Sequence, residues 1–243
     1  MTSSKCAHGV AVFDQYATAY DRWFDDHPAI YHAEVEALRR FVPAAGLGLE
    51  IGAGTGRFLV PLGVTIGVEP AWHMAALARN RGVRACRAIG EALPFRQGQF
   101  DFALLVTVIC FVSDVPTLLR EARRVLRRDG VLIIGFIDRA SELGQRYESR
   151  KAASRFYQAA RFYSSPEVST FIQDAGFTEL RFCQTLFEPD DGTPTVYDVR
   201  EGYGAGGFVV VSARNTAAAT RIQASTQVVP SIVARGLRAG TRR

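Results

Sequence analysis

Residues Leu49–Phe58 read LEIGAGTGRF, an apolar run followed by glycines at positions 52, 54 and 56. A strand that ends in a glycine-rich turn is typical of a nucleotide site, because glycine lets the backbone approach a ligand and the next helix offers free N–H groups. A dinucleotide fingerprint would place a third glycine where Arg57 stands, and the phosphate loop of NTPases would need a Lys-Ser/Thr pair that this stretch lacks. The spacing therefore excludes both and leaves open what the loop holds.

The chain around this loop alternates between apolar strand-like runs and helix-like runs. Strands are predicted for residues 47–51, 65–68, 83–88, 100–106, 131–137, 178–187 and 207–213. Helices are predicted for residues 57–62, 72–82, 115–126 and 164–176. Apolar strands that alternate with helices indicate a parallel sheet with helices on both faces. The sequence therefore predicts an α/β fold built on a doubly wound sheet of seven strands.

Two helical additions to this sheet are predicted. Aromatic residues that include Tyr20 and Trp23 recur at spacings of three and four, which predicts a helical cap over residues 13–41. Pro28 marks a turn within this cap. Residues 139–163 are charged and rich in aromatic side chains, and they predict one long helical insertion, or lid, after the fifth strand.

The charge of the chain is unevenly distributed. The net charge is +5, but residues 214–243 hold six arginines and no acid or lysine, which leaves about −1 for residues 1–213. We expect residues 1–213 to form a single domain and residues 214–243 to form a basic, disordered tail. A domain that is nearly neutral argues against a nucleic-acid partner.

Neither a metal site nor a membrane segment is indicated. The four cysteines form no C-x-x-C pair and the four histidines form no H-x-x-x-H pair, so no metal site is predicted. The longest apolar run, 102–112, has about half of the roughly 20 residues that a membrane helix needs. The first twelve residues lack the apolar region of a secretory signal. We therefore expect a cytoplasmic protein without membrane contact.

Two acids narrow the ligand of the glycine loop. Glu50 directly precedes the turn, where it would repel a pyrophosphate but attract an ammonium group. Glu69 ends the second strand, where an acid can hydrogen-bond both hydroxyls of a ribose. A nucleoside that carries an ammonium group and no phosphate fits both positions, and S-adenosylmethionine (SAM) has this chemistry.

Five motifs extend the pattern beyond the loop. They are LEIGAGTGRF at 49–58, VEP at 68–70, EALPF at 91–95, FDFALL at 100–105 and EARRVLRRDGVLIIGF at 121–136. In this order they resemble the motifs of class I SAM-dependent methyltransferases, above all the broad group that includes the quinone-biosynthesis methyltransferases. The likeness covers about residues 13–213. It implies a Rossmann-like sheet whose last strand is antiparallel, SAM as the cofactor and S-adenosylhomocysteine (SAH) as its product.

The resemblance also implies which residues hold the cofactor. They are Tyr16, Tyr20, Glu50, Gly52, Ala53, Gly54, Gly56, Glu69, Pro70, Met74, Gly90, Glu91, Ala92, Val106 and Thr107. Glu50 and the glycines would shape the methionine end, and Glu69 would bind the ribose. Many relatives have Asp where Ile89 stands, so Glu91 or the backbone is left to read the adenine amino group. The segment between Gly56 and Glu69 is about one helical turn shorter than usual, which predicts a stunted first crossover helix.

The cap, the lid and the loops beside them contain the residues that are candidates to contact the methyl acceptor or to take a proton from it. The residues predicted to contact substrate are Trp23, Cys110, Arg139, Phe156, Tyr157, Arg161 and Tyr163. Their aromatic members could form a pocket, which could grip a cationic amine, or could simply pack the lid. Tyr20, Asp138 and Tyr203 are candidates to take a proton from an acceptor.

The predicted function is methyl transfer from SAM to a small-molecule acceptor with an O, N or S nucleophile. Positioning and water exclusion supply much of the rate of such a displacement, so no strong base is required. The alternative is a non-catalytic SAM-binding sensor or partner subunit. A nucleic-acid methyltransferase would carry an Asn/Asp-Pro-Pro-aromatic loop after the fourth strand, where this chain reads VTVICF at 106–111. The sequence does not indicate the oligomeric state.

Overall fold

A computed structural model describes residues 4–187 and 198–216. Within these residues the centre is one sheet of eight strands in the order β3-β2-β1-β4-β5-β8-β6-β7. The strands are β1 Gly48–Ile51, β2 Ile66–Val68, β3 Arg84–Cys86, β4 Phe100–Val106, β5 Leu126–Ile137, β6 Thr178–Thr185, β7 Arg200–Glu201 and β8 Phe208–Arg214. Strands β1 to β5 pair in parallel, and β8 runs antiparallel to both β5 and β6. The predicted doubly wound sheet with an antiparallel last strand is confirmed, and the two-residue β7 is added at its edge.

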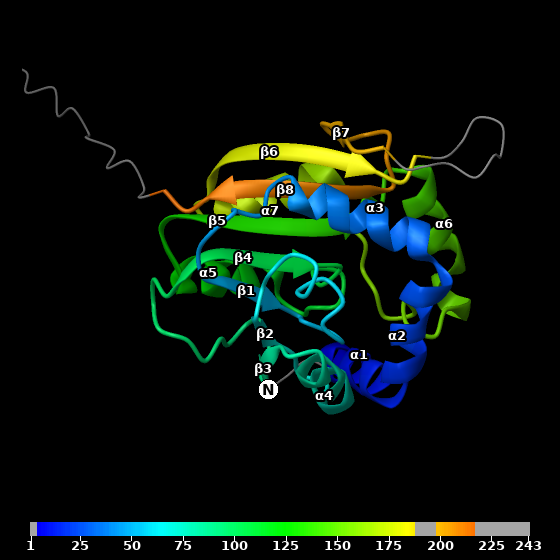
Figure 1. The fold of residues 1–243 in the computed structure, drawn as a ribbon. Coiled ribbons are helices and arrows are strands. Elements are labelled where there is room, and N and C mark those ends of the chain that lie inside the picture. The colour runs from blue at the N-terminus through cyan, green and yellow to red at the C-terminus, as the bar shows by residue number, and fades with distance from the viewer. Residues whose placement is uncertain (1–3, 188–197, 217–243) are drawn as a thin grey trace, which may run out of the picture.

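Helices cover both faces of the sheet (Figure 1). They are α1 Ser4–Gln15, α2 Ala17–Asp26, α3 Pro28–Arg39, α4 Trp72–Asn80, α5 Val115–Val125, α6 Glu142–Arg150, the short 3-10 helix η1 Lys151–Ala153 and α7 Ser165–Asp174. Helix α3 contacts β5, β6 and β8, while α5 contacts β5 and α7 contacts β6. Figure 1 shows α3 in front of the sheet and α5 and α7 behind it.

Two hydrophobic cores lie on the two sides of the sheet. Leu105 of β4 packs in the core under α5 and α7, whereas Leu104 and Val106 pack in the core under α2 and α3. Alternate residues of a strand point to opposite faces, so a central strand that is apolar throughout is buried on both. The two cores hold the parallel strands in place, so that their carboxyl ends form one fixed edge of the sheet. Ligands of open α/β sheets bind at this edge.

The segment after the glycine loop is a series of turns, so the helix predicted over residues 57–62 is wrong. Gly56 and Gly63 have positive φ angles of 86° and 70°. Pro61 has no N–H to donate to a helical ladder. The predicted stunting of the first crossover is confirmed in a stronger form.

The lid is helical only in its first part, so the single helix predicted over residues 139–163 is wrong. Helix α6 starts after Ser141, whose hydroxyl accepts the N–H of Gly144 at 3.0 Å. Residues 154–163 continue without regular helix, and Phe162 packs in a cluster at the strand ends. Burial of these aromatic side chains against the sheet outweighs their helical spacing.

The cap consists of three helices rather than the two that Pro28 alone indicates. It starts at Ser4 in the described part of the chain, and its helices are separated at Tyr16 and His27. Pro28 begins α3, as expected for a proline in a first helical turn.

The predicted domain boundary after residue 213 falls inside a strand. Strand β8 continues to Arg214, and the side-chain amide of Asn215 donates to the carbonyl oxygens of Arg123, Leu126 and Arg127 at 3.2, 3.1 and 3.0 Å. The folded unit therefore includes Asn215. The rest of the predicted tail, residues 217–243, lies outside the described residues.

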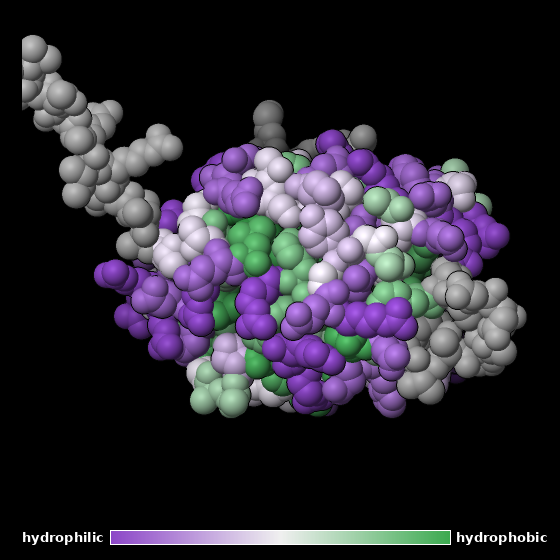
Figure 2. All heavy atoms as spheres, turned by 90° about the horizontal axis from the view of Figure 1, so that it is seen from above, coloured by the Kyte–Doolittle hydropathy of each residue, from purple (hydrophilic) through white to green (hydrophobic). Residues whose placement is uncertain are grey.

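The described residues carry neither a membrane span nor a metal cluster. No helix within residues 4–187 and 198–216 is long and apolar enough to cross a membrane. In the same part of the chain no group of three or more His, Cys, Asp or Glu residues could hold a metal ion. Figure 2 shows a face that is mostly hydrophilic with smaller apolar patches between the charged side chains.

Candidate functional site

A cleft lies at the carboxyl ends of the parallel strands, beside the glycine loop. The described residues that line it, here called the loop cleft, are Gly9, Val10, Phe13, Tyr20, Ile51, Gly52, Gly54, Glu69, Pro70, Met74, Ala88, Ile89, Gly90, Glu91, Val106, Thr107, Val108, Phe111 and Val112. Helices α1 and α2 supply one side of it, and the loops after β1, β2, β3 and β4 supply the other. The position is the one at which doubly wound sheets bind nucleotides.

The glycines of the loop are required for two different reasons. Gly52 has φ +78°, and a Cβ there would lie 2.3 Å from Cγ2 of Val108, so a larger residue would be strained and would collide with that side chain. Gly54 has φ +53°, and a Cβ there would meet only Cε of Met74 at 3.7 Å. Gly54 therefore leaves room in the loop cleft for a ligand to approach the backbone.

The carboxylate of Glu69 is held in a fixed orientation. Its Oε2 accepts the N–H of Gly54 and its Oε1 accepts the N–H of Ala71, both at 2.9 Å. Each carboxylate oxygen can accept a second hydrogen bond, so both remain available to a pair of donors. Burial raises the pKa of Glu69 to about 7, although the two backbone donors oppose the rise.

Glu50 is a buried acid without a full set of partners. Its residue is 2% exposed, and its Oε2 has no hydrogen-bond partner within the described residues. Burial, together with the charge of Glu69, raises the pKa of Glu50 well above its usual value. A buried carboxyl without a partner is costly, so this arrangement points to a cationic group that arrives with a ligand.

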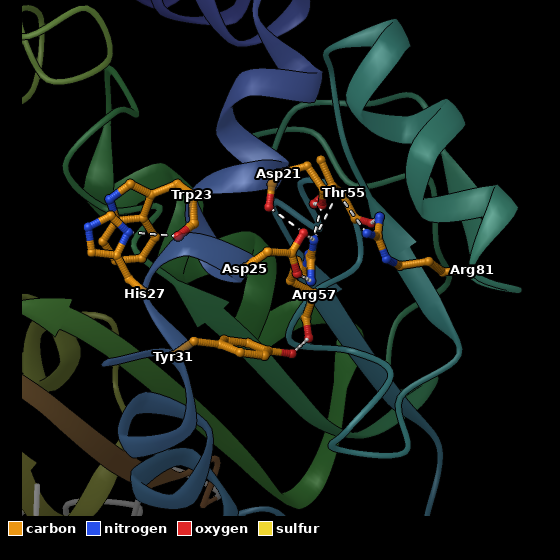
Figure 3. Close-up of polar contacts among 8 residues, drawn as sticks. All are labelled: Asp21, Trp23, Asp25, His27, Tyr31, Thr55, Arg57 and Arg81. Carbon is orange, nitrogen blue, oxygen red and sulfur yellow. Dashed lines mark hydrogen bonds and ion pairs between the residues drawn. The ribbon is translucent and has the colours of Figure 1, made fainter. Parts of the chain in front are cut away.

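Arg57 ties the glycine loop to the cap (Figure 3). Its guanidinium donates to Asp21 at 2.9 and 3.0 Å and to both oxygens of Asp25 at 2.7 Å. Asp21 also accepts the hydroxyl of Thr55 at 2.6 Å and the guanidinium of Arg81 at 2.7 Å. Burial opposes ionisation of Asp21, but these hydrogen bonds lower its pKa to about 2. We call these five residues the cap clamp, because they fix α2 over the loop cleft.

A second cavity of about 320 Å³ lies between the cap, the lid and the strand ends. The described residues that line it, here called the inner chamber, are Tyr20, Trp23, Phe24, Ile30, Glu34, Phe58, Thr107, Ile137, Leu143, Tyr147, Ser154, Phe156, Tyr157 and Leu186. Tyr20 and Thr107 line both this chamber and the loop cleft, so the two spaces meet at these residues. An apolar cavity with a few polar groups is the usual form of a small-molecule site.

Glu34 is the only carboxylic acid among the described residues that line the inner chamber. The residue is 6% exposed, and burial raises its pKa to about 8. No hydrogen bond or ion pair to it is formed by any other residue of the described chain. It is the second buried acid of the site that lacks a cationic partner.

The junction of the two spaces has an unusual backbone. Thr107 has φ 52°, which is a rare conformation for a β-branched residue. Its N–H donates to the carbonyl of Gly135 at 2.8 Å, which helps to hold it. Strained backbone of this kind clusters at functional sites. Burial raises the pKa of Tyr20 far above its usual value, against a side-chain hydrogen bond with Thr107, so the phenol keeps its proton at neutral pH.

Most of the residues predicted to hold the cofactor lie together. Tyr20, Gly52, Gly54, Glu69, Pro70, Met74, Gly90, Glu91, Val106 and Thr107 line the loop cleft. Glu50 and Ala53 line a small adjoining cavity, while Tyr16, Gly56 and Ala92 line none of these spaces. Gly56 instead lies against α4, and Ala92 is exposed.

The predicted substrate residues separate into two sets. Trp23, Phe156 and Tyr157 line the inner chamber, and Tyr157 also borders a small cavity with Cys110 and Tyr163. Burial raises the pKa of Cys110 to about 12, so this thiol is not a nucleophile at neutral pH.

Arg139, Arg161, Asp138 and Tyr203 lie away from both spaces. Arg139 and Arg161 are exposed, and Arg139 pairs with Glu167 at 2.8 Å. The carboxylate of Asp138 accepts from Ala140 N at 2.8 Å and from Ser165 Oγ at 2.6 Å.

Tyr203 is 46% exposed, and its ring packs on Phe182 of β6 at the far edge of the sheet. Asp138 and Tyr203 are therefore not retained as proton acceptors. Directly after β5, Asp138 forms a parallel bridge with Tyr163, in which Arg139 N donates to the carbonyl of Tyr163 at 3.0 Å, and neither Asp138 nor Arg139 lines the chamber.

Sequence reasoning missed the acid of the chamber. Glu34 lies four residues after Ile30 and four before Leu38, on the face of α3 that packs inward. An acid at an apolar position of a helical pattern is the signal that could have identified it. The cap clamp was missed as well. The acids of α2 are visible in the sequence, but the sequence does not show which distant arginine they pair with.

A parallel sheet with a glycine loop and a buried acid after the second strand defines a domain that binds a nucleoside cofactor without relying on phosphates. Residues 49–134 match the methyltransferase domain family. A crystal structure from Thermotoga maritima is described as a SAM-dependent methyltransferase, possible histamine N-methyltransferase. It is 44% identical, with a TM-score of 0.82, and the match covers 86% of this chain and 100% of that one. The chain belongs to the class I SAM-dependent methyltransferases.

Two curated relatives show how far the similarity extends along the chain. An uncharacterized protein of Methanocaldococcus jannaschii, MJ1123, is 48% identical over 83% of this chain and 98% of its own length. The demethylmenaquinone methyltransferase of Roseiflexus castenholzii is 36% identical over 37% of this chain and 42% of its own length. The resemblance to quinone-biosynthesis methyltransferases is thus confined to part of the chain.

Proposed function

We propose that this protein transfers the methyl group of SAM to a small-molecule acceptor bound in the inner chamber. The observation that carries the proposal is the shared wall of the two spaces. Because Tyr20 and Thr107 line both, an acceptor in the chamber would face a cofactor in the loop cleft across these residues. Holding two reactants in this way converts a bimolecular step into an effectively unimolecular one.

The residues of the loop cleft suit SAM in charge and shape. The fixed carboxylate of Glu69 would accept the two ribose hydroxyls, and the unpartnered Glu50 would attract the ammonium of the methionine moiety. Gly54 offers open backbone to the ligand, and Met74 and Gly90 would border the adenine. When bound, SAM supplies a methyl group on a sulfonium, which a nucleophile can displace without further activation.

The chain's own part in the reaction is to position the acceptor and to exclude water. Aromatic and aliphatic side chains make up most of the chamber wall, and the cap clamp holds α2 across the loop cleft. Tyr20 keeps its proton and can donate a hydrogen bond at the junction, so it orients an acceptor rather than removing a proton from it. The rate would come from proximity in a dry site.

A small acceptor is favoured over a polymer and over a role without catalysis. The chamber lies between the cap and the lid, and its volume of about 320 Å³ suits a small molecule. A SAM sensor would need the loop cleft but not a second cavity beside it. The relative from Thermotoga maritima is described with a small amine, histamine, as its candidate acceptor, which supports the same class.

The test has two stages. Calorimetry should detect SAM binding by the purified full chain, and Glu69→Gln should weaken it at least tenfold while Glu36→Gln, an exposed acid on α3, should not. A panel of small amines, phenols, thiols and carboxylates, with histamine included, is then screened for SAH release. Absence of SAM binding would refute the cofactor site, and SAM binding without SAH release from any acceptor would favour a sensor.

A further inference from the structure

The carboxyl of Glu34 is the most distinctive polar group of the inner chamber. It projects from α3 into a cavity of about 320 Å³ whose other lining residues are mostly aromatic and aliphatic. The residue is more than nine-tenths buried, and no other residue of the described chain pairs with it. Its oxygens are not among the fully buried side-chain atoms that lack a partner, so they are open to the space of the chamber and available to a ligand there.

A purely structural role does not account for this acid. Glu34 caps no helix and bonds to no backbone group within residues 4–187 and 198–216. It does not line the loop cleft, so a cofactor bound there would not supply its counter-ion. A Leu or Met at this position of α3 would fill the space without the cost of burying a carboxyl.

Among the described residues, the titratable groups around Glu34 are tyrosines, and Arg146, whose charge reaches Tyr147, does not line the chamber. The titratable side chains whose pKa values respond to its charge are Tyr20 of α2, Tyr147 of α6 and Tyr157 of the lid, and all three pKa values are raised. Neither a lysine nor an arginine lines the chamber in the described part of the chain. The protein thus supplies a negative group and leaves the positive one to the ligand.

We propose that the acceptor is a small amine, bound as its ammonium ion, with Glu34 as its counter-ion and the aromatic rings of the chamber around it. This proposal rests on the proposed methyl transfer and names its substrate class. Tyr20 and Phe156 lie with ring centroids 5.5 Å apart, and Tyr147 and Tyr157 at 4.9 Å. Rings grouped in this way favour a cation by their negative faces and bury its apolar part.

Other acceptor classes fit the chamber less well. A carboxylate would be repelled by the ionised form of Glu34, and no basic residue among the described lining residues offsets this repulsion. A neutral phenol or alcohol can hydrogen-bond with the neutral acid, but it brings no charge that favours the carboxylate. A cationic ligand differs from both, because it forms an ion pair with the ionised form of Glu34.

Binding of an ammonium ion should release a proton. Because burial raises the pKa of Glu34 to about 8, the empty chamber holds mainly the neutral acid near pH 7. Pairing with a cation favours the carboxylate. The balance of binding is one carboxylic acid and one ammonium ion giving one carboxylate–ammonium pair and one proton in solution. Before methyl transfer the bound ammonium ion must pass a proton to the Glu34 carboxylate, because only the neutral amine has the lone pair that forms the new N–C bond as the S–C bond breaks and SAH leaves.

The experiment measures binding to the full chain saturated with SAH, so that no turnover occurs. Three probes of matched size are used, namely 2-phenylethylamine, 2-phenylethanol and 3-phenylpropanoate. Calorimetry at pH 7 in two buffers with different ionisation enthalpies gives both the affinity and the number of protons released. The variants are Glu34→Gln, which keeps the shape of the side chain, and Glu36→Gln on the same helix as the control.

We expect the amine to bind at least tenfold more tightly than the alcohol or the carboxylate, with release of more than half a proton. Glu34→Gln should lose this preference and the proton release while its SAH affinity stays within twofold of wild type. Equal binding of the three probes, binding of none of them, or an unchanged preference in Glu34→Gln would overturn the proposal. If the wild-type chain does not bind SAH, the proposed function is refuted instead. The two failures are therefore distinguishable.

Discussion

Glu34→Gln should change how the stability of the ligand-free protein depends on pH. In the wild type, the pKa of Glu34 is about 8 in the folded chain and 4.5 in the unfolded chain. Below pH 4.5 the acid is neutral in both states and has no effect. As the pH rises to 8, the unfolded chain ionises while the folded chain stays neutral, so folding is progressively disfavoured. Glutamine cannot ionise, so this loss is absent in the variant.

The size of the effect follows from the pKa shift. Each pKa unit corresponds to about 1.4 kcal/mol, so the full cost above pH 8 approaches about 5 kcal/mol. Between pH 5 and pH 7.5 we expect Glu34→Gln to gain about 3 kcal/mol relative to the wild type. For a chain of this size that corresponds to a difference of about 6 to 12 °C in Tm between the two pH values.

Thermal unfolding at half-unit pH steps, on dialysed protein without SAM, provides the measurement. Glu50 and Glu69 also have raised pKa values, so the wild-type curve contains their effects too. The difference between variant and wild type removes those shared effects and isolates Glu34. Glu36→Gln, which alters an exposed acid of the same helix, should run parallel to the wild type. If Glu34→Gln also runs parallel, the buried neutral acid on which the chamber argument depends does not exist.

Three further predictions concern the loop cleft, the cap clamp and the end of the fold. Glu69→Gln should weaken SAM binding at least tenfold in calorimetry, with the fold retained by circular dichroism, and unchanged affinity would rule out the ribose contact. Asp21→Asn should lower stability in urea unfolding by about 1 to 2 kcal/mol, a small effect because solvent partly screens the cluster, whereas the exposed Asp26→Asn should not. Asn215→Ala leaves three carbonyl oxygens without their donor and should cost about 1 to 3 kcal/mol. If the stability of Asn215→Ala equals that of the wild type, Asn215 does not stabilise the fold, and the domain ends at residue 213 as the sequence predicts.

The sheet was predictable because its signal is local and repeated. Strand β4 matches its predicted span, 100–106, because a run of apolar residues buried on both faces has no competing interpretation. The failures fall where tertiary packing decides. Residues 154–163 have helical spacing, but burying Phe162 at the strand ends gains more than completing a helix does. Residues 57–62 form turns instead of a helix, because the backbone bends at the glycines on either side of them.

The loop cleft was easier to predict from the sequence than the inner chamber. Glu50 and Glu69 stand at fixed distances from a motif, so sequence spacing places them. Glu34 belongs to a helix far from any motif, and only the packing of α2, α3 and α6 shows that its carboxyl faces a cavity. Tyr203 illustrates the opposite error. Its glycine-rich segment suggested a residue beside the site, but the ring packs on Phe182 at the far edge of the sheet.

The glycine loop beside the loop cleft also contacts the helix that carries the acid of the chamber. Arg57 stands where a dinucleotide-binding loop has glycine, and its guanidinium holds α2 through Asp21. Its carbonyl oxygen accepts the hydroxyl of Tyr31 on α3 at 2.5 Å (Figure 3), and Glu34 follows three residues later on that helix. One residue therefore fixes both the cover of the loop cleft and the helix that carries the counter-ion. Asp21→Asn should consequently weaken 2-phenylethylamine binding as well as SAM binding, whereas independent sites would let the amine affinity persist.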